Sequence, residues 1–99
     1  MQQLRQITIS KDNFLLLPIN PNPATTSDVK ITYSVGYESY TEIEIYNSLG
    51  KMISKPISSI TPEGIFVIKL NTDELSSGIY FCRMSSGPYQ SLQKFVISK

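Results

Sequence analysis

Apolar and polar residues alternate at every second position in three stretches of this 99-residue chain. The stretches cover residues 29–35, 41–45 and 66–70. Successive side chains of a β-strand point to opposite faces, so this period predicts strands with one buried face and one solvent-exposed face. No stretch has the 3.6-residue period of an amphipathic helix, and residues 72–76 offer at most a helical turn within a connector. We therefore expect an all-β chain.

Other stretches are rich in β-branched and aromatic residues, which favour strands. They predict strands at residues 14–19, 79–84 and 92–98, with residues 4–9 as a further candidate. The side chains that we expect to face the core are Ile31, Tyr33, Ile43, Ile45, Phe66, Ile68, Tyr80, Cys82, Met84, Phe95 and Ile97.

Proline and glycine separate these stretches. Residues 18–23 contain three prolines, which cannot donate a backbone hydrogen bond, so the chain must leave the sheet there or run along its edge. Turn sequences occupy residues 47–50, 61–64 and 85–88. Short strands with frequent turns are typical of antiparallel sandwiches. We therefore predict an immunoglobulin-like antiparallel β-sandwich of about seven or eight strands.

Composition excludes several classes of function. The 9 Lys and Arg residues against 8 Asp and Glu residues leave a net charge of +1, too small for a nucleic-acid-binding face. The chain has no histidine, which excludes Ser-His-Asp and Cys-His catalysis and removes the commonest zinc ligand. No apolar run approaches the length of a membrane-spanning helix. We expect no enzyme activity, cofactor, metal or nucleic-acid partner, and no transmembrane segment.

The reactive side chains have simple structural explanations. Glu42 and Glu44 could form a carboxylate pair for glycoside hydrolysis, but their alternation along a strand places them on a solvated face. Cys82 has no histidine to activate its thiol, so we interpret it as a small buried hydrophobic residue.

Residues 75–82 read Leu-Ser-Ser-Gly-Ile-Tyr-Phe-Cys, the order of an immunoglobulin-type tyrosine corner. In such a corner, a tyrosine near the start of a strand donates its hydroxyl to the upstream backbone. We expect the ring of Tyr80 to be buried and its hydroxyl to bind a backbone carbonyl. The sequence has one cysteine and no tryptophan, so the similarity to antibody domains is one of architecture.

Four segments, taken in order, carry a family resemblance. They are Pro21-Asn22-Pro23-Ala24, residues 43–51, residues 75–81 and the closing residues 94–99. Over residues 14–99 the chain closely resembles the type A family of C-terminal sorting domains of the type IX secretion system. The family's recognisable elements, and hence the candidates for recognition by the translocon, are Pro21, Asn22, Pro23, Gly78, Tyr80, Lys94 and Lys99. Family tails often carry lysines that are more closely spaced than the last two.

The resemblance implies that the domain is an address label on a larger parent protein. In certain Gram-negative bacteria, such a domain lies at the C-terminal end of a cargo protein and directs that protein from the periplasm across the outer membrane. The cargo is then secreted or attached to the cell surface. The implied partners are the outer-membrane translocon, a sortase-like protease that removes the domain, and the parent cargo domain. Residues 1–13 are then a linker from the parent, and residues 14–99 are the sorting domain.

The fold also suits a different class of function, an immunoglobulin- or fibronectin-like adhesive or carbohydrate-binding accessory module. Exposed Tyr37, Tyr40 and Tyr89 could stack on sugars, but without tryptophan or an aromatic strip we interpret them as ordinary surface tyrosines. An accessory module has no reason to end its chain at Lys99, so further domain sequence beyond that residue would favour this alternative.

Overall fold

The computed structural model describes residues 13–25 and 27–99, so the candidate strand at residues 4–9 and most of the predicted linker lie outside the described residues. The described part contains strands and turns and no helix, and residues 72–75 form a hydrogen-bonded turn. The strands are β1 (Leu15–Leu16), β2 (Asp28–Val35), β3 (Ser39–Asn47), β4 (Met52–Thr61), β5 (Gly64–Asn71), β6 (Gly78–Ser86) and β7 (Tyr89–Ile97).

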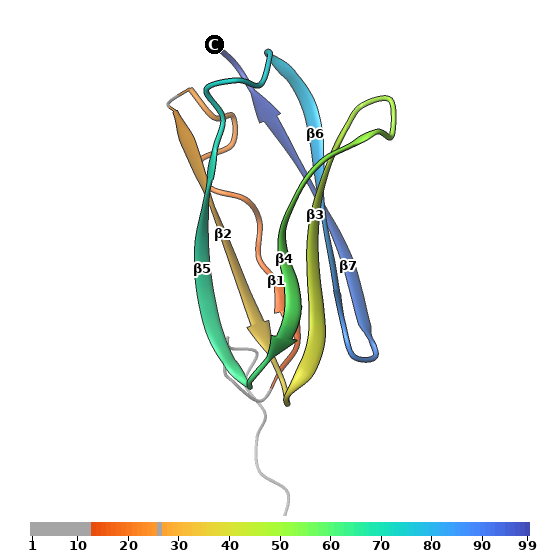
Figure 1. The fold of residues 1–99 in the computed structure, drawn as a ribbon. Helices are drawn as coiled ribbons and strands as arrows, with labels where there is room; N and C mark the ends of the chain where they lie inside the picture. Colours follow the sequence, from red (N-terminus) through yellow and green to blue (C-terminus); the bar gives the residue numbers. More distant parts are fainter. Residues whose placement is uncertain (1–12, 26) are drawn as a thin grey trace, which may run out of the picture.

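The strands form two antiparallel sheets that pack face to face (Figure 1). One sheet has the strand order β1-β2-β5 and the other has the order β4-β3-β6-β7. The fold is therefore the predicted immunoglobulin-like sandwich, with seven strands.

The core lies between the sheets and follows the alternation of the sequence. Its buried hydrophobic residues are Leu16, Ile19, Ala24, Val29, Ile31, Tyr33, Val35, Ile43, Ile45, Tyr80, Cys82, Met84, Phe95 and Ile97. Phe66 and Ile68 face inward as predicted, but they are only partly buried. Their strand, β5, is the edge of its sheet, so no neighbouring strand covers one flank of their side chains.

The sequence pattern does not predict strand β4. It contains Pro56, which argues against a central strand, and it lacks clear alternation. In the structure β4 is an edge strand, where a missing N–H costs no ladder bond. Its pairing with β3 also shifts register, because Lys55 and Pro56 both lie opposite Glu44. Such a bulge bends the strand and increases its twist.

The predicted strand at residues 14–19 is shorter than expected. Regular pairing with β2 covers β1 alone, and the N–H of Leu17 then donates to the carbonyl of Thr32. Asn20 makes an isolated bridge to Lys30. Beyond this point the prolines end the pairing with β2, and the chain crosses to the other sheet, where it meets β7.

Candidate functional site

The Pro21-Asn22-Pro23-Ala24 segment binds the edge of β7. The Asn22 side chain acts as a strand neighbour would, since Oδ1 accepts the N–H of Val96 at 2.9 Å and Nδ2 donates to the carbonyl of Lys94 at 3.4 Å. The N–H of Ala24 then donates to the carbonyl of Val96 at 2.7 Å. The carbonyl of Ala24 accepts the N–H of Ser98 at 2.9 Å. The segment therefore covers the second half of this edge.

Tyr80 forms the predicted tyrosine corner. Its side chain is buried, and its hydroxyl donates to the carbonyl of Ser76 at 2.7 Å. Its ring stacks on Phe95 of β7, with ring centroids 5.8 Å apart. Gly78 begins β6 with a φ of 156°, a conformation that residues with a Cβ rarely adopt. Both residues thus shape the start of β6.

The two terminal lysines differ in their contacts. Lys94 lies exposed on the outer face of β7, and its backbone carbonyl accepts a hydrogen bond from the side-chain amide of Asn22. The ammonium group of Lys99 donates to the carbonyl of Asp73 at 2.8 Å, and the Lys99 N–H donates to Ser77 Oγ at 2.9 Å. These contacts hold the last residue against the connector that leads into β6.

The structure brings the seven predicted site residues to one end of the sandwich. Asn22 contacts β7 at Lys94, Gly78 pairs with Ile97, and Tyr80 pairs with Phe95. This is the end where the chain terminates in Figure 1. The prolines, Asn22, Gly78 and the two lysines are exposed there, whereas Tyr80 is buried beneath them.

Two side chains that the sequence pattern does not single out as structural, Tyr89 and Gln93, link the sheets. The Tyr89 hydroxyl accepts the N–H of Leu16 at 3.1 Å, and Gln93 Nε2 donates to the carbonyl of Leu16 at 3.1 Å. Tyr89 is partly buried and stacks on Phe14, so its assignment as an ordinary surface tyrosine was wrong. Both side chains lie on the inward face of β7, as Phe95 does. Polar side chains at inward positions of a strand indicate hydrogen bonds to the facing sheet, and this was the signal in the sequence.

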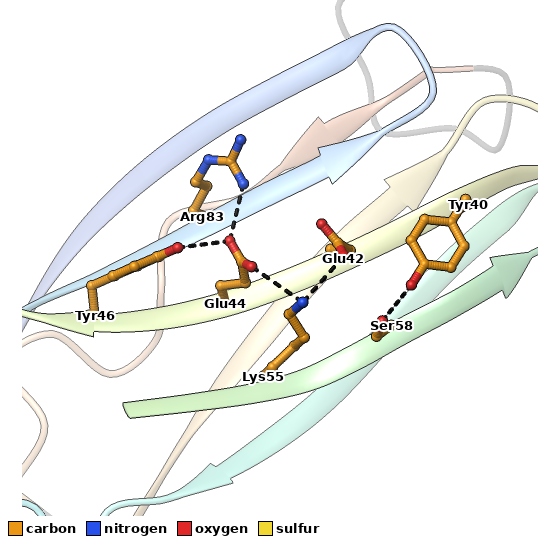
Figure 2. Close-up of polar contacts among 7 residues, drawn as sticks. All are labelled: Tyr40, Glu42, Glu44, Tyr46, Lys55, Ser58 and Arg83. Atoms are coloured by element: carbon orange, nitrogen blue, oxygen red, sulfur yellow. Dashed lines mark hydrogen bonds and ion pairs between the residues drawn. The ribbon is translucent and has the colours of Figure 1, made fainter. Parts of the chain in front are cut away.

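Glu44 is not solvated as predicted. It lies on the outer face, as the alternation requires, but only 8% of it is exposed. Arg83 Nη1 and the Tyr46 hydroxyl donate to Glu44 Oε1 at 3.0 and 2.9 Å, and Lys55 Nζ lies 3.5 Å from Oε2 (Figure 2). The cause is the neighbouring strands, because β6 places Arg83 directly opposite Glu44 and the β4 bulge brings in Lys55.

The charges of this cluster hold its carboxylate ionised. Burial raises the pKa of Glu44, but the hydrogen bonds from Tyr46 and Arg83 and the charge of Lys55 outweigh it, so its pKa lies below the usual value. The hydrogen bond and charge of Glu42 raise the pKa of Lys55, whose ammonium lies 3.2 Å from Glu42 Oε2. Glycoside hydrolysis needs one carboxyl with a raised pKa beside an ionised one. This cluster instead ties β4, β3 and β6 together.

Cys82 is fully buried, and burial raises the pKa of its thiol to about 12. Since the thiolate is the reactive form, we expect the folded domain to react with a maleimide at pH 8 about a thousandfold more slowly than an unfolded chain. Mass spectrometry of samples with and without 6 M guanidinium measures this ratio. Equal rates in the two samples would contradict the buried position.

Within residues 13–25 and 27–99, the structure contains no helix long and apolar enough to cross a membrane. Over the same residues, no group of three or more His, Cys, Asp and Glu side chains is placed to hold a metal ion.

Comparison with known proteins gives both a family and a fold. The family model described as the secretion system C-terminal sorting domain matches residues 18–98. Among solved structures, the chain is similar to PorZ, an essential bacterial surface component of the type IX secretion system of Porphyromonas gingivalis. That match has 18% identity and a TM-score of 0.62, and it covers 85% of this chain but only 11% of PorZ.

A second similar structure is CopC from Methylosinus trichosporium OB3b. The match has 19% identity and a TM-score of 0.57, and it covers 87% of this chain and 94% of CopC. At these identities, the two structures show a shared fold. Comparison with curated protein sequences gave no match.

Proposed function

Because this chain belongs to the family of secretion system C-terminal sorting domains, we propose that it directs a parent protein through the type IX secretion system by presenting one end of its sandwich to the outer-membrane translocon. The observation that carries the proposal is the family match over residues 18–98. The role is non-enzymatic, and the parent is a secreted or cell-surface protein. A sortase-like protease that removes the domain after transport is the second proposed partner.

The exposed chemistry of this end divides the candidate residues into two groups. The Asn22 amide and the Tyr80 hydroxyl are already bonded within the domain, so they support the surface rather than contact a partner. Lys94 is exposed, and its backbone carbonyl is bonded to Asn22, which lies between the exposed residues Pro21 and Pro23. Lys99 is also exposed, and its ammonium group uses one of three N–H donors on the carbonyl of Asp73, which leaves two for a partner. The recognition surface that we propose is therefore Pro21, Pro23, Lys94 and Lys99, with Asn22, Gly78 and Tyr80 as its scaffold.

The opposite end of the sandwich suits attachment of the cargo. Ser34 Oγ, near the end of β2, donates to the carbonyl of Asn13. Phe14 packs near Gly87 in the β6–β7 turn. The described chain thus begins at the end remote from the proposed recognition surface (Figure 1). Cargo joined upstream would leave that surface accessible.

A fusion experiment tests this proposal. The domain is joined to a fluorescent protein that is exported to the periplasm, in a host that carries the secretion system and exports a native sorting domain. We expect the wild-type fusion to reach the medium or the cell surface. We expect the Lys94→Ala, Lys99→Ala double variant to be exported at least about tenfold less, since it removes two charges that a partner can bind.

The matched control is the Lys30→Ala, Lys69→Ala double variant. It removes the same charge from two exposed positions on the other sheet, and we expect it to be exported like the wild type. Retention of the wild-type fusion in the periplasm would reject the sorting role. Equal export of both double variants would keep the sorting role but remove the terminal lysines from it.

A further inference from the structure

Four strands lie at sheet edges, and three of them offer no long free edge. β1 is only two residues long. β4 carries Pro56 and two register shifts, which interrupt its free edge. Residues 22–24 cover the second half of β7. In contrast, β5 pairs with β2 over all eight of its residues without a register shift. Figure 1 shows β5 at the lateral border of the described part of the chain, where no other labelled strand lies beyond it.

Within residues 13–25 and 27–99, the backbone of β5 has a free row of hydrogen-bonding groups. The N–H of Thr72 donates to the carbonyl of Ser27 at 2.7 Å, which sets the phase of this antiparallel ladder. Alternate residues from Gly64 to Thr72 therefore bond to β2. The N–H and C=O groups of Ile65, Val67 and Lys69, which lie between them, point away from the sheet.

The side chains beside this free edge are largely apolar. On the outer face of the sheet, Ile65 is 47% exposed and Val67 is 57% exposed. On the inner face, Phe66 and Ile68 are only partly buried. A long, regular edge with apolar residues on both faces is a template for another strand. We infer that a second copy of this chain is its occupant, through antiparallel β5–β5 pairing around a two-fold axis at Val67.

The sequence of β5 is self-complementary in that register. Val67 opposes Val67 of the other copy, and the two residues exchange backbone hydrogen bonds because both present their outward groups. Ile65 then opposes Lys69 of the other copy, whose aliphatic stem can cover it. Phe66 opposes Ile68 on the inner face. No like charges stand directly opposite one another across the new contact.

Charge complementarity also favours a second copy of the chain as the partner of β5. Lys69 pairs directly with Lys30 of β2, which places two like charges side by side in the monomer. In the two-fold register, exposed Glu63 of the second copy lies diagonally opposite Lys69, within reach of a long side chain. The dimer therefore adds two Lys69–Glu63 contacts. With only eight residues at the edge, we expect weak association, with a Kd between about 10 μM and 1 mM.

Analytical ultracentrifugation of the full chain tests the proposal. We expect the weight-average mass to rise from 11.1 kDa toward twice that value as the concentration approaches 1 mM. Val67→Lys places two charges at the axis and should raise the Kd at least about tenfold. Leu92→Lys on β7 is the matched control, because Leu92 is also 57% exposed, and it should leave the Kd unchanged. A wild type that stays monomeric at 1 mM would overturn the proposal.

A charge exchange tests the register. Lys69→Glu and Glu63→Lys should each raise the Kd about three- to tenfold, and the double variant should restore it. Amide exchange by NMR should show protection of Ile65, Val67 and Lys69 that grows with concentration. Protection that grows at Gln90 and Leu92 instead would assign association to β7 and overturn the proposal.

Discussion

Replacing Tyr80 with alanine should lower the free energy of unfolding by about 3–5 kcal/mol. The change removes a buried ring that stacks on Phe95, and it also removes the hydroxyl that donates to Ser76. Urea denaturation followed by circular dichroism measures the loss. This is a large fraction of the total stability of a domain of this size, so we expect the variant to be partly unfolded at 37 °C.

The Tyr80→Phe variant separates the two contributions. It keeps the ring and its stacking but leaves the carbonyl of Ser76 without its partner, and it should cost about 1–2 kcal/mol. Ser77→Ala on the neighbouring exposed residue is a control for the connector, and it should cost less because it removes only the bond to the Lys99 N–H. A Tyr80→Phe variant as stable as the wild type would refute the tyrosine corner as a stabilising element.

The fold could be predicted because one sheet face is buried along most strands. Alternation assigned Ile31, Ile43 and Ile45 to the core, and all three are fully buried. The corner at Tyr80 was also predictable, since the glycine, the tyrosine and the cysteine two residues later form a local pattern that is typical of the start of such a strand. These features depend on short stretches of sequence.

The missed features depend on contacts between distant residues. β4 is an edge strand that tolerates Pro56, so its sequence does not carry the alternation of a half-buried strand. The burial of Glu44 comes from Arg83 and Lys55, which lie 39 and 11 positions away along the chain and meet it through pairing of β3 with two neighbours. No local pattern predicts such a meeting.

The sequence predicted which residues belong to the candidate site, but not which of them are structural and which are exposed. A family resemblance gathered Asn22, Tyr80 and Lys94, but it did not divide structural from exposed roles. The structure makes that division, because the Asn22 amide replaces a strand neighbour on β7 and the Tyr80 hydroxyl is bonded internally. A sequence motif can therefore mark residues that build a surface as well as residues that are exposed on it.

Phe95→Ala should also lower the free energy of unfolding by about 3–5 kcal/mol, because Phe95 is the largest fully buried side chain. Phe95→Leu keeps most of the volume and should cost about 1–1.5 kcal/mol. Tyr80 and Phe95 form one stacked pair, so a double-mutant cycle with Tyr80→Leu and Phe95→Leu should show a coupling of about 1 kcal/mol. Additive losses would show that the stacking contributes nothing beyond burial.

The same variants test whether secretion requires a folded sandwich. Phe95 lies on the strand that carries Lys94, but its side chain points into the core, so neither substitution changes the proposed recognition surface directly. If that surface must be assembled, the Phe95→Ala fusion should lose export while Phe95→Leu keeps it, and lowering the growth temperature should recover part of the loss. Full export of a Phe95→Ala domain that is unfolded by circular dichroism would mean that the machinery reads an extended tail, and the structural assignment of Asn22 and Tyr80 as scaffold would then have no bearing on export.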